Sequence, residues 1–257
     1  IISIIKIPLQ FKIVILNCRG IFIMEMIVQG IVQAFHLLIS GDEEVFRVVL
    51  LTLQVSGIAT AISVLFGVPL GLWLALKDFP GKQVLSSLVN FGMGLPPVVI
   101  GLIVSLILWR NGPMGYLGLM YTPPAMVAAQ AIIALPIVAG LSFAAILSLN
   151  PKLHWQLVSM GASWWQKSWL LIREAQLGLM AAVIAGFGRV ISEVGASMMV
   201  GGNIKGQTRV LTTATVYEVN KGNFDVALAL SIILLLVAYF IVVLLTYLQH
   251  GGKSERA

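Results

Sequence analysis

Charged residues are scarce in this 257-residue chain, because Asp, Glu, Lys and Arg together make up 10% of it. A soluble domain carries about 25%. With 59% hydrophobic residues, the chain has too few polar groups to cover a globular surface, so lipid must cover part of it. Its apolar runs are continuous and about twice as long as a membrane β-strand. The class predicted is therefore all-α, a polytopic transmembrane helical bundle.

Other absences exclude several kinds of site. The single cysteine, Cys18, excludes an internal disulfide and a multi-cysteine metal centre, and the three histidines show no ligand spacing, so no metal is predicted. No G-x-x-x-x-G-K-[ST] motif occurs, so the chain does not bind ATP through a P-loop. No nucleophile–base pair indicates an enzyme, and no cofactor is predicted for this chain. The net charge of +6 is scattered among loops, a distribution that does not indicate a nucleic-acid partner.

The N-terminal region has two parts. Residues 1–23 are rich in isoleucine but interrupted by basic residues and a proline, and we interpret them as an atypical extension, with the natural start at Met24 or Met26. Residues 24–40 predict a helix that lies at the membrane interface or packs peripherally on the bundle. Its polar residues fall on one stripe: Glu25, Gln29, Gln33 and His36.

Five hydrophobic segments follow, each near the ~20 residues that cross a bilayer. They cover residues 48–76, 84–109, 124–149, 177–200 and 225–248. Three glycines in the first segment allow close helix contacts: Gly57, Gly67 and Gly71. In the second segment, the adjacent prolines Pro96 and Pro97 predict a backbone break at mid-depth, which is either a gate or a structural kink.

The longest polar stretch between two strongly apolar segments is 150–176, and it predicts two short helices joined by a glycine turn. The pair Asn150–Pro151 is typical of an N-cap followed by proline at the first helical position. Gly161 ends this helix, and Ser163 with Gln166 forms a capping-box pattern that begins the next one. Without further context, a solvated connector with amphipathic ends is the alternative interpretation.

Basic residues set the orientation, since cytoplasmic loops are enriched in lysine and arginine. If the stretch 150–176 is cytoplasmic, its side holds Lys77, Lys82, Lys152, Lys167, Arg173, Lys253 and Arg256. The other side holds Arg47, Arg110, Lys205, Arg209 and Lys221, with the acidic residues Asp42, Glu43 and Glu44. This bias places the polar stretch and the C-terminus inside the cell.

Two groups of polar residues are candidates for chemistry. Arg189 and Glu193 lie four residues apart within the fourth segment, so they share a helix face and can pair. Because each charge costs about 2.5–3.5 kcal/mol at a helix centre, neither faces lipid. They either line a solute path or form a structural ion pair. In the outer loop 201–224, hydroxyls and charge suit an oxyanion or a docking protein, and a plain solvated loop is the alternative; the candidates are Thr208, Arg209 and Thr212.

The stretch 150–176 resembles the EAA loop of type I ABC importer permeases, in which E-A-A-x-x-x-G precedes I-x-L-P. Gly161 matches the glycine, whereas residues 155–157 and 171–174 depart from the flanks. The segment from Arg189 is similar to one in molybdate, tungstate and sulfate permeases, which carry R-x-x-x-E-x-G-A and then G-x-T-x-x-L. The matching residues are Arg189, Glu193, Gly195, Ala196, Gly206, Thr208 and Leu211. The resemblance covers about residues 24–248 and is nearest to tungstate-specific permeases.

This resemblance implies the type I ABC importer permease fold, with five core spans plus the N-terminal interfacial or peripheral helix. One transmembrane permease domain would cover 24–248, followed by a cytoplasmic tail at 249–257. The chain would act as a homodimer in the inner (plasma) membrane of a prokaryote and import tungstate, molybdate or sulfate by alternating access. Two separate ATPase subunits, which hold ATP and Mg²⁺, would dock on the loop, and an extracytoplasmic binding protein would deliver the oxyanion. The coupling residues would be Leu157, Met160, Gly161, Ala162, Ser163, Trp164 and Trp165.

Two other classes of function are alternatives. An ion-coupled secondary transporter would carry inverted repeats and its own ion-binding carboxylates. Glu193 is the one clear intramembrane acid, and Arg189 can neutralise it, which disfavours this class. A membrane scaffold protein would need neither a gate nor an ATPase.

Overall fold

The computed structural model describes residues 24, 28, 30–34, 36 and 42–251. All regular elements in this part of the chain are helices, as the composition predicts. They are α2 (Glu43–Leu76), α3 (Lys82–Gly94), α4 (Pro97–Leu108), the 3-10 turn η1 (Gly115–Leu117), α5 (Pro123–Leu147), α6 (Pro151–Ser159), α7 (Trp164–Glu174), α8 (Gln176–Ile191), α9 (Gly195–Gly201), α10 (Leu211–Lys221) and α11 (Phe224–Gly251). The extension 1–23 and the tail residues 252–257 lie outside the described residues.

Helices α2 and α5 form the centre of the bundle and pack along each other through small residues. A Cβ atom added at Gly71 would lie 2.5 Å from the carbonyl oxygen of Ala139, and one at Gly67 would lie 3.1 Å from the Val138 side chain. Glycine is therefore required where the two backbones approach most closely. The prediction of close contact is confirmed for these two glycines, but it is wrong for Gly57, whose Cβ would meet no described atom within 4 Å.

The second predicted span is broken where the prolines predict it. α3 and α4 meet at 99°, with Pro96 as the N-cap of α4 and Pro97 as its first residue. A proline at the first helical position loses no intrahelical hydrogen bond, so the break leaves α4 intact. By contrast, α5 continues through its internal proline, Pro136.

The fourth predicted span, 177–200, is not one continuous helix. α8 ends at Ile191, and the short helix α9 begins at Gly195. Toward the other end, α7 and α8 meet at 72°. Within the described part of the chain, α2, α5 and α11 are each long and apolar enough to span a membrane, and there are five candidate spans if each bent pair counts as one.

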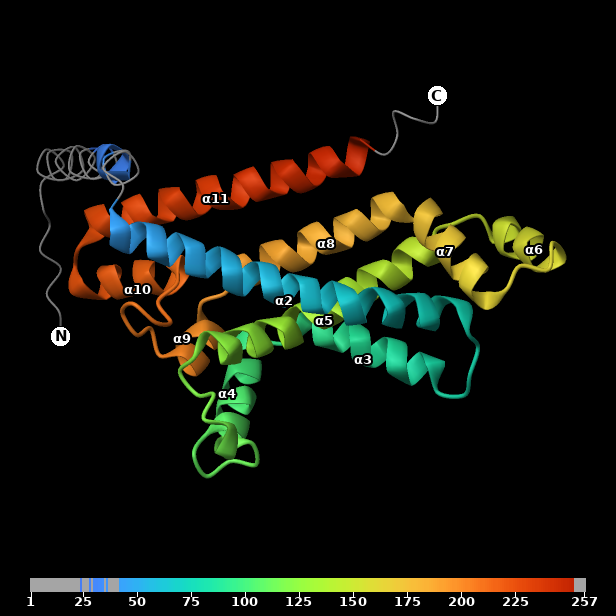
Figure 1. Ribbon diagram of the computed structural model, residues 1–257, viewed down its shortest axis with the longest axis horizontal. Coiled ribbons are helices and arrows are strands. Elements are labelled where there is room, and N and C mark those ends of the chain that lie inside the picture. Colours follow the sequence, from blue (N-terminus) through green and yellow to red (C-terminus); the bar gives the residue numbers. More distant parts are fainter. Residues whose placement is uncertain (1–23, 25–27, 29, 35, 37–41, 252–257) are drawn as a thin grey trace, which may run out of the picture.

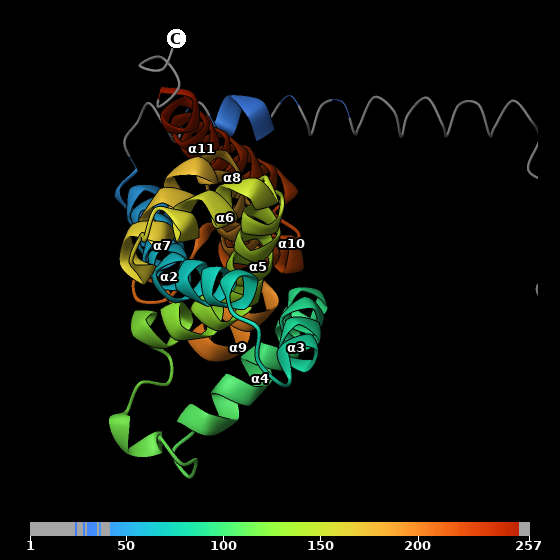
Figure 2. The same ribbon diagram turned by 90° about the vertical axis from the view of Figure 1, so that its right-hand side faces the viewer.

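α11 lies on one side of the central helices, and α3 with α4 lies on the other (Figures 1 and 2). α6 and α7 occupy one end of the bundle, and α10 occupies the opposite end (Figure 1). The outer segment 201–224 is thus not the irregular loop that its polarity predicts. Leu211 and Ala214 of α10 are buried in a cluster with α11, and this burial holds the helix.

The described residues near the N-terminus are helical and lie against α11. Gly30 packs on Leu228 so closely that a Cβ would lie 2.7 Å from the Leu228 Cβ, and Ala34 is buried in the same cluster. The polar stripe does not form this contact, since Gln33 is half-buried and His36 is exposed. Glu25 and Gln29 of the predicted stripe lie outside the described residues.

Candidate functional site

The turn between α6 and α7 is built by local signals in the sequence. The Asn150 side chain accepts a hydrogen bond from the Lys152 N–H at 3.0 Å, which caps α6. Ser163 Oγ accepts from the Gln166 N–H, and Gln166 Oε1 accepts from the Ser163 N–H, so the predicted capping box is formed. Gly161 joins the helices with a φ of +70°, in the left-handed region that favours glycine. The predicted helix–glycine–helix stretch is confirmed in each of these details.

The predicted loop residues divide into an inner and an outer set. Leu157 is buried with Leu171 in a cluster that includes residues of α2, α5 and α8, and Ala162 packs against it. The outer set consists of Met160, 81% exposed, with Trp164 and Trp165, 41% and 78% exposed. The two indole rings contact each other edge to face at 5.0 Å. An exposed apolar group on a capped, anchored turn is typical of a protein-docking surface.

On the opposite side from α11, a cavity of about 340 Å³ lies where α3 breaks into α4. Apolar side chains of α2, α3, α4 and α5 form its wall, and Arg189 of α8 is the one charged residue among the described residues that line it. The Arg189 guanidinium makes no ion pair or side-chain hydrogen bond with any described residue. Such a cation in an apolar cavity is a candidate contact for a passing anion.

The predicted ion pair between Arg189 and Glu193 is wrong for the part of the chain that the structure describes. Because α8 ends at Ile191, the two side chains no longer share a helix face. Glu193 is 8% exposed, and its Oε1 accepts a hydrogen bond from the Ala196 N–H at 3.0 Å, which places the carboxylate at the start of α9. Glu193 therefore holds the break between α8 and α9 instead of neutralising the arginine.

The candidate hydroxyls of the outer loop are used within the protein. Thr208 is fully buried; its Oγ1 donates to the Gly201 carbonyl and accepts from the Ile204 N–H. Thr212 Oγ1 donates to the Glu193 carbonyl at 3.1 Å. Their expected role as free donors to a ligand is corrected, since these hydrogen bonds fix the loop and the α8–α9 break.

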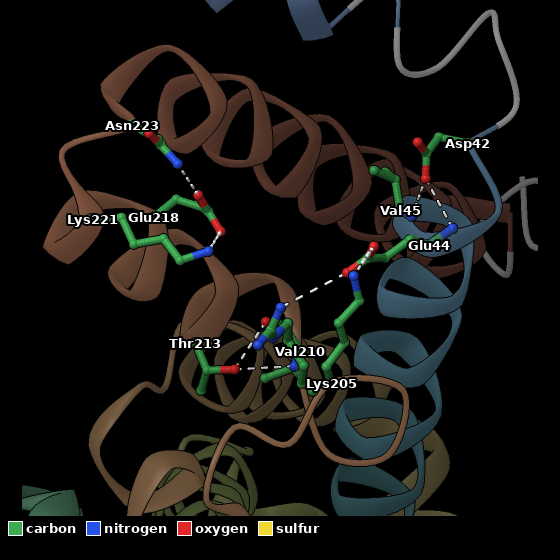
Figure 3. A network of polar contacts seen from close by, with 10 residues as sticks. Asp42, Glu44, Val45, Lys205, Val210, Thr213, Glu218, Lys221 and Asn223 are labelled. Atoms are coloured by element: carbon green, nitrogen blue, oxygen red, sulfur yellow. Dashed lines mark hydrogen bonds and ion pairs between the residues drawn. The ribbon is translucent and has the colours of Figure 1, made fainter.

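The third outer-loop candidate, Arg209, is part of a charged cluster that sequence reasoning missed. Its Nη1 lies 3.8 Å from Glu44 Oε1. Figure 3 shows Lys205 beside the same carboxylate, with its Nζ 2.6 Å from Glu44 Oε2. Both Arg209 and Lys221 lie over the ring of Tyr217. Desolvation acts to lower the pKa of Lys221, but the Tyr217 hydroxyl and the Glu218 carboxylate outweigh it, so this pKa is raised.

Gln130 of α5 is a second residue that sequence reasoning missed. It is 3% exposed, and its Nε2 donates to Ser197 Oγ at 2.7 Å, linking α5 to α9. The sequence does contain a signal for this contact: Gln130 is an amide within an apolar span, and such a group must find a hydrogen-bond partner inside the protein.

Comparison with known proteins places this geometry in a family. Residues 67–251 match the family described as "Binding-protein-dependent transport system inner membrane component". The tungstate uptake system permease protein TupB of Peptoclostridium acidaminophilum is 38% identical over 227 residues, which are 88% of this chain and 100% of that protein. TupB of Campylobacter jejuni is 36% identical over 93% of this chain and 98% of its own length.

Solved structures share the fold at lower identity. A bacterial alginate ABC transporter, in complex with its alginate pentasaccharide-bound periplasmic protein, matches with a TM-score of 0.72 and 17% identity over 96% of this chain and 95% of that chain. The MetNI methionine ABC transporter in an inward-facing conformation matches with a TM-score of 0.68 and 19% identity, over 81% of this chain and 96% of that chain. The expected ABC importer permease fold is thereby confirmed.

Proposed function

The chain belongs to the family of binding-protein-dependent transport system inner membrane components, and on that premise we propose that it imports tungstate or a closely related tetrahedral oxyanion. The observation that carries the proposal is the likeness to tungstate uptake permeases over nearly the whole length of both chains. Its relatives are transport permeases, and so we assign ATP hydrolysis, with its Mg²⁺, to separate cytoplasmic subunits. This likeness supports the assignment of the chain as an inner-membrane permease subunit of an ABC importer.

We propose the α6–α7 turn as the docking surface for these ATPase subunits. Met160, Trp164 and Trp165 offer apolar area at the tip of the turn, while Leu157 anchors it to the bundle. Ser163 and Gly161 fix its shape through the capping box and the left-handed backbone. A surface that is both exposed and rigid can transmit force to the spans behind it.

The proposed transport path runs along the face of α3, α4, α5 and α8, between two copies of the chain in a homodimer. Arg189 supplies a positive charge in the apolar cavity, and the α3–α4 break at Pro96 and Pro97 provides the candidate gate. Glu193 serves this path indirectly, because it holds the start of α9, which packs on α4 through Ala196 and Gly101. Because the Glu193 carboxylate accepts a hydrogen bond from the Ala196 N–H, it is not free to bind a coupling ion. This contact therefore does not favour a secondary transporter.

At the other end, we propose that the exposed tip of the loop 201–210 receives the oxyanion-binding protein. Thr208 and Thr212 support this role by fixing the loop from inside, and Arg209 ties it to α2 through Glu44. The exposed residues of this loop are Gly202, Ile204, Lys205, Gly206 and Gln207.

The decisive experiment measures ATP hydrolysis by the assembled complex in lipid nanodiscs, with the binding protein loaded in turn with tungstate, molybdate and sulfate. Stimulation is expected to be strongest with tungstate. Stimulation by sulfate that equals or exceeds it would refute the substrate while leaving the permease function intact. Uptake into vesicles that follows a proton or sodium gradient without ATP would refute the mechanism as a whole.

A further inference from the structure

A second cavity, of about 450 Å³, lies on the face opposite the proposed path, at the end of the bundle that holds α10. Residues of α2, α10 and α11 line it, together with Lys205, Arg209 and the half-buried Gln33 of the N-terminal helix. This volume is within the range of small-molecule sites in proteins. The cavity shares no lining residue with the one at the broken span, so any ligand that it binds is distinct from the substrate in the proposed path.

Arg209 lines the cavity with a hydrogen-bond donor that has no partner among the described residues. Its side chain is 12% exposed, and its nearest carboxylate oxygen, on Glu44, is 3.8 Å away, beyond hydrogen-bond distance. Its Nε is buried and has no hydrogen-bond partner among the described residues. A guanidinium carries five N–H donors in a planar fork that matches a phosphate group. The ring of Tyr217, 4.5 Å from the guanidinium carbon, satisfies the charge in part but accepts no such pair of hydrogen bonds.

The charges around the cavity balance. The cations are Lys205, Arg209 and Lys221, and the acids are Asp42, Glu44 and Glu218. Figure 3 shows Glu218 between Lys221 and Asn223, and Glu44 directed at Lys205, so positive and negative groups alternate along the rim. A ligand of net charge zero that carries both signs fits this lining better than a simple anion does.

The remaining wall is apolar and belongs to membrane spans. Val45 and Val48 come from the first turns of α2, and Val226 and Leu230 come from the first turns of α11. Tyr217 also lines the cavity, and tyrosine is enriched at membrane–water interfaces. A cavity with a charged rim and an apolar wall matches a lipid, which has a charged headgroup and apolar acyl chains. A free oxyanion has no apolar part that could pack against the wall.

We propose that this cavity binds the headgroup of a zwitterionic phospholipid. The phosphate lies against Arg209 and Lys221, the two cations over the Tyr217 ring. The ammonium group lies against the carboxylate of Glu44, and an acyl chain follows the seam between α2 and α11. The inference requires that these two helices lie in lipid, and it does not depend on the identity of the transported anion. It assigns the face around α10 and α11 to lipid rather than to transport.

The test is native mass spectrometry of the full-length chain, purified with its partner subunits in detergent and titrated with phosphatidylethanolamine. Arg209→Gln is expected to weaken lipid binding about tenfold, the effect of one charge-assisted hydrogen bond. Lys221→Gln removes the second cation proposed to contact the phosphate from a side chain that is 47% exposed, and it is expected to weaken lipid binding in the same direction even if Arg209→Gln assembles poorly. The matched control is Arg47→Gln, which removes the same charge at the same end from a side chain that pairs with Glu43 and does not line this cavity.

Equal lipid binding by wild type, Arg209→Gln and Lys221→Gln would overturn the proposal. Phosphatidylglycerol that binds as strongly as phosphatidylethanolamine would overturn the zwitterionic assignment. Loss of the bound lipid when inorganic phosphate is added at millimolar concentration would show a site for free oxyanions instead. The supporting result is selective binding of phosphatidylethanolamine that added phosphate does not affect. Both variants should weaken this binding, and the control should not.

Discussion

Replacement of Gly161 tests whether the shape of the α6–α7 turn governs docking of the ATPase. The residue has a φ of +70°, and a Cβ placed on it would meet no described atom within 4 Å. The cost of a side chain is therefore one of backbone conformation, with no steric clash added. For an ordinary L-residue, the left-handed region costs about 1–2 kcal/mol. If docking requires this turn, the same free energy weakens the affinity for the ATPase subunit by about 5- to 30-fold.

The series Gly161→Asn, Gly161→Ala and Gly161→Val separates backbone strain from bulk. Asparagine adopts positive φ most readily, so its affinity is expected nearest to wild type, followed by alanine and then the β-branched valine. The assay is titration of the ATPase subunit into the permease in nanodiscs, followed by hydrolysis stimulated by the binding protein. Gly57→Val is the matched control, since that glycine also has open space around it but lies within α2.

An unchanged dissociation constant for Gly161→Val would refute the reasoning, because docking would then be indifferent to the turn. A wild-type value for Gly161→Ala together with a strong loss for Gly161→Val would show that side-chain size, and not φ, decides the affinity. Loss in the Gly57→Val control would mean that the assay reports assembly of the spans.

Three further outcomes are expected. Gly71→Ala should lower the unfolding temperature in detergent and the yield of dimer, because its methyl group overlaps the α5 backbone at a cost of about 1–3 kcal/mol, whereas Gly57→Ala should leave both unchanged. Arg189→Gln should assemble normally, since no described residue pairs with the arginine, but should reduce tungstate uptake into proteoliposomes at least tenfold; normal uptake would remove it from the path. Glu193→Ala should destabilise the permease by about 1 kcal/mol through loss of the hydrogen bond to the start of α9, as measured by thermal unfolding, and Glu193→Gln, which keeps an acceptor oxygen, should lose less.

The parts of this structure that sequence reasoning predicts are those fixed by neighbours in the chain. The N-cap at Asn150, the turn at Gly161 and the capping box at Ser163 each depend on residues at most three positions away, and all three are found where predicted. The proline break between α3 and α4 has the same local origin. Hydropathy likewise identified the long spans, because a run of apolar residues needs no partner to be recognised.

The parts that were missed depend on contacts between distant segments. The end of α8 at Ile191 is held by the Thr212 hydrogen bond to the Glu193 carbonyl, across 19 positions of sequence. The helix α10 is rich in threonine and valine, which are weak helix formers, and it is stabilised by burial against α11. The partner of Gln130, on α9, lies 67 positions away. A pattern read from neighbouring residues cannot identify partners that are this far apart in the sequence.

The direct junction of α7 with α8 connects the proposed docking surface rigidly to the helix that carries Arg189. Ala175 is both the last cap of α7 and the first cap of α8, so the two helices share one buried residue and no flexible linker. Arg189 lies 13 residues beyond Gln176, or roughly 20 Å along the helix axis at 1.5 Å per residue. A tilt of about 10° at this elbow therefore moves the arginine by about 3 Å, a full hydrogen-bond length. On the proposed docking surface and transport path, a small rotation of the ATPase subunits would therefore change the distance between the Arg189 charge and the transported anion.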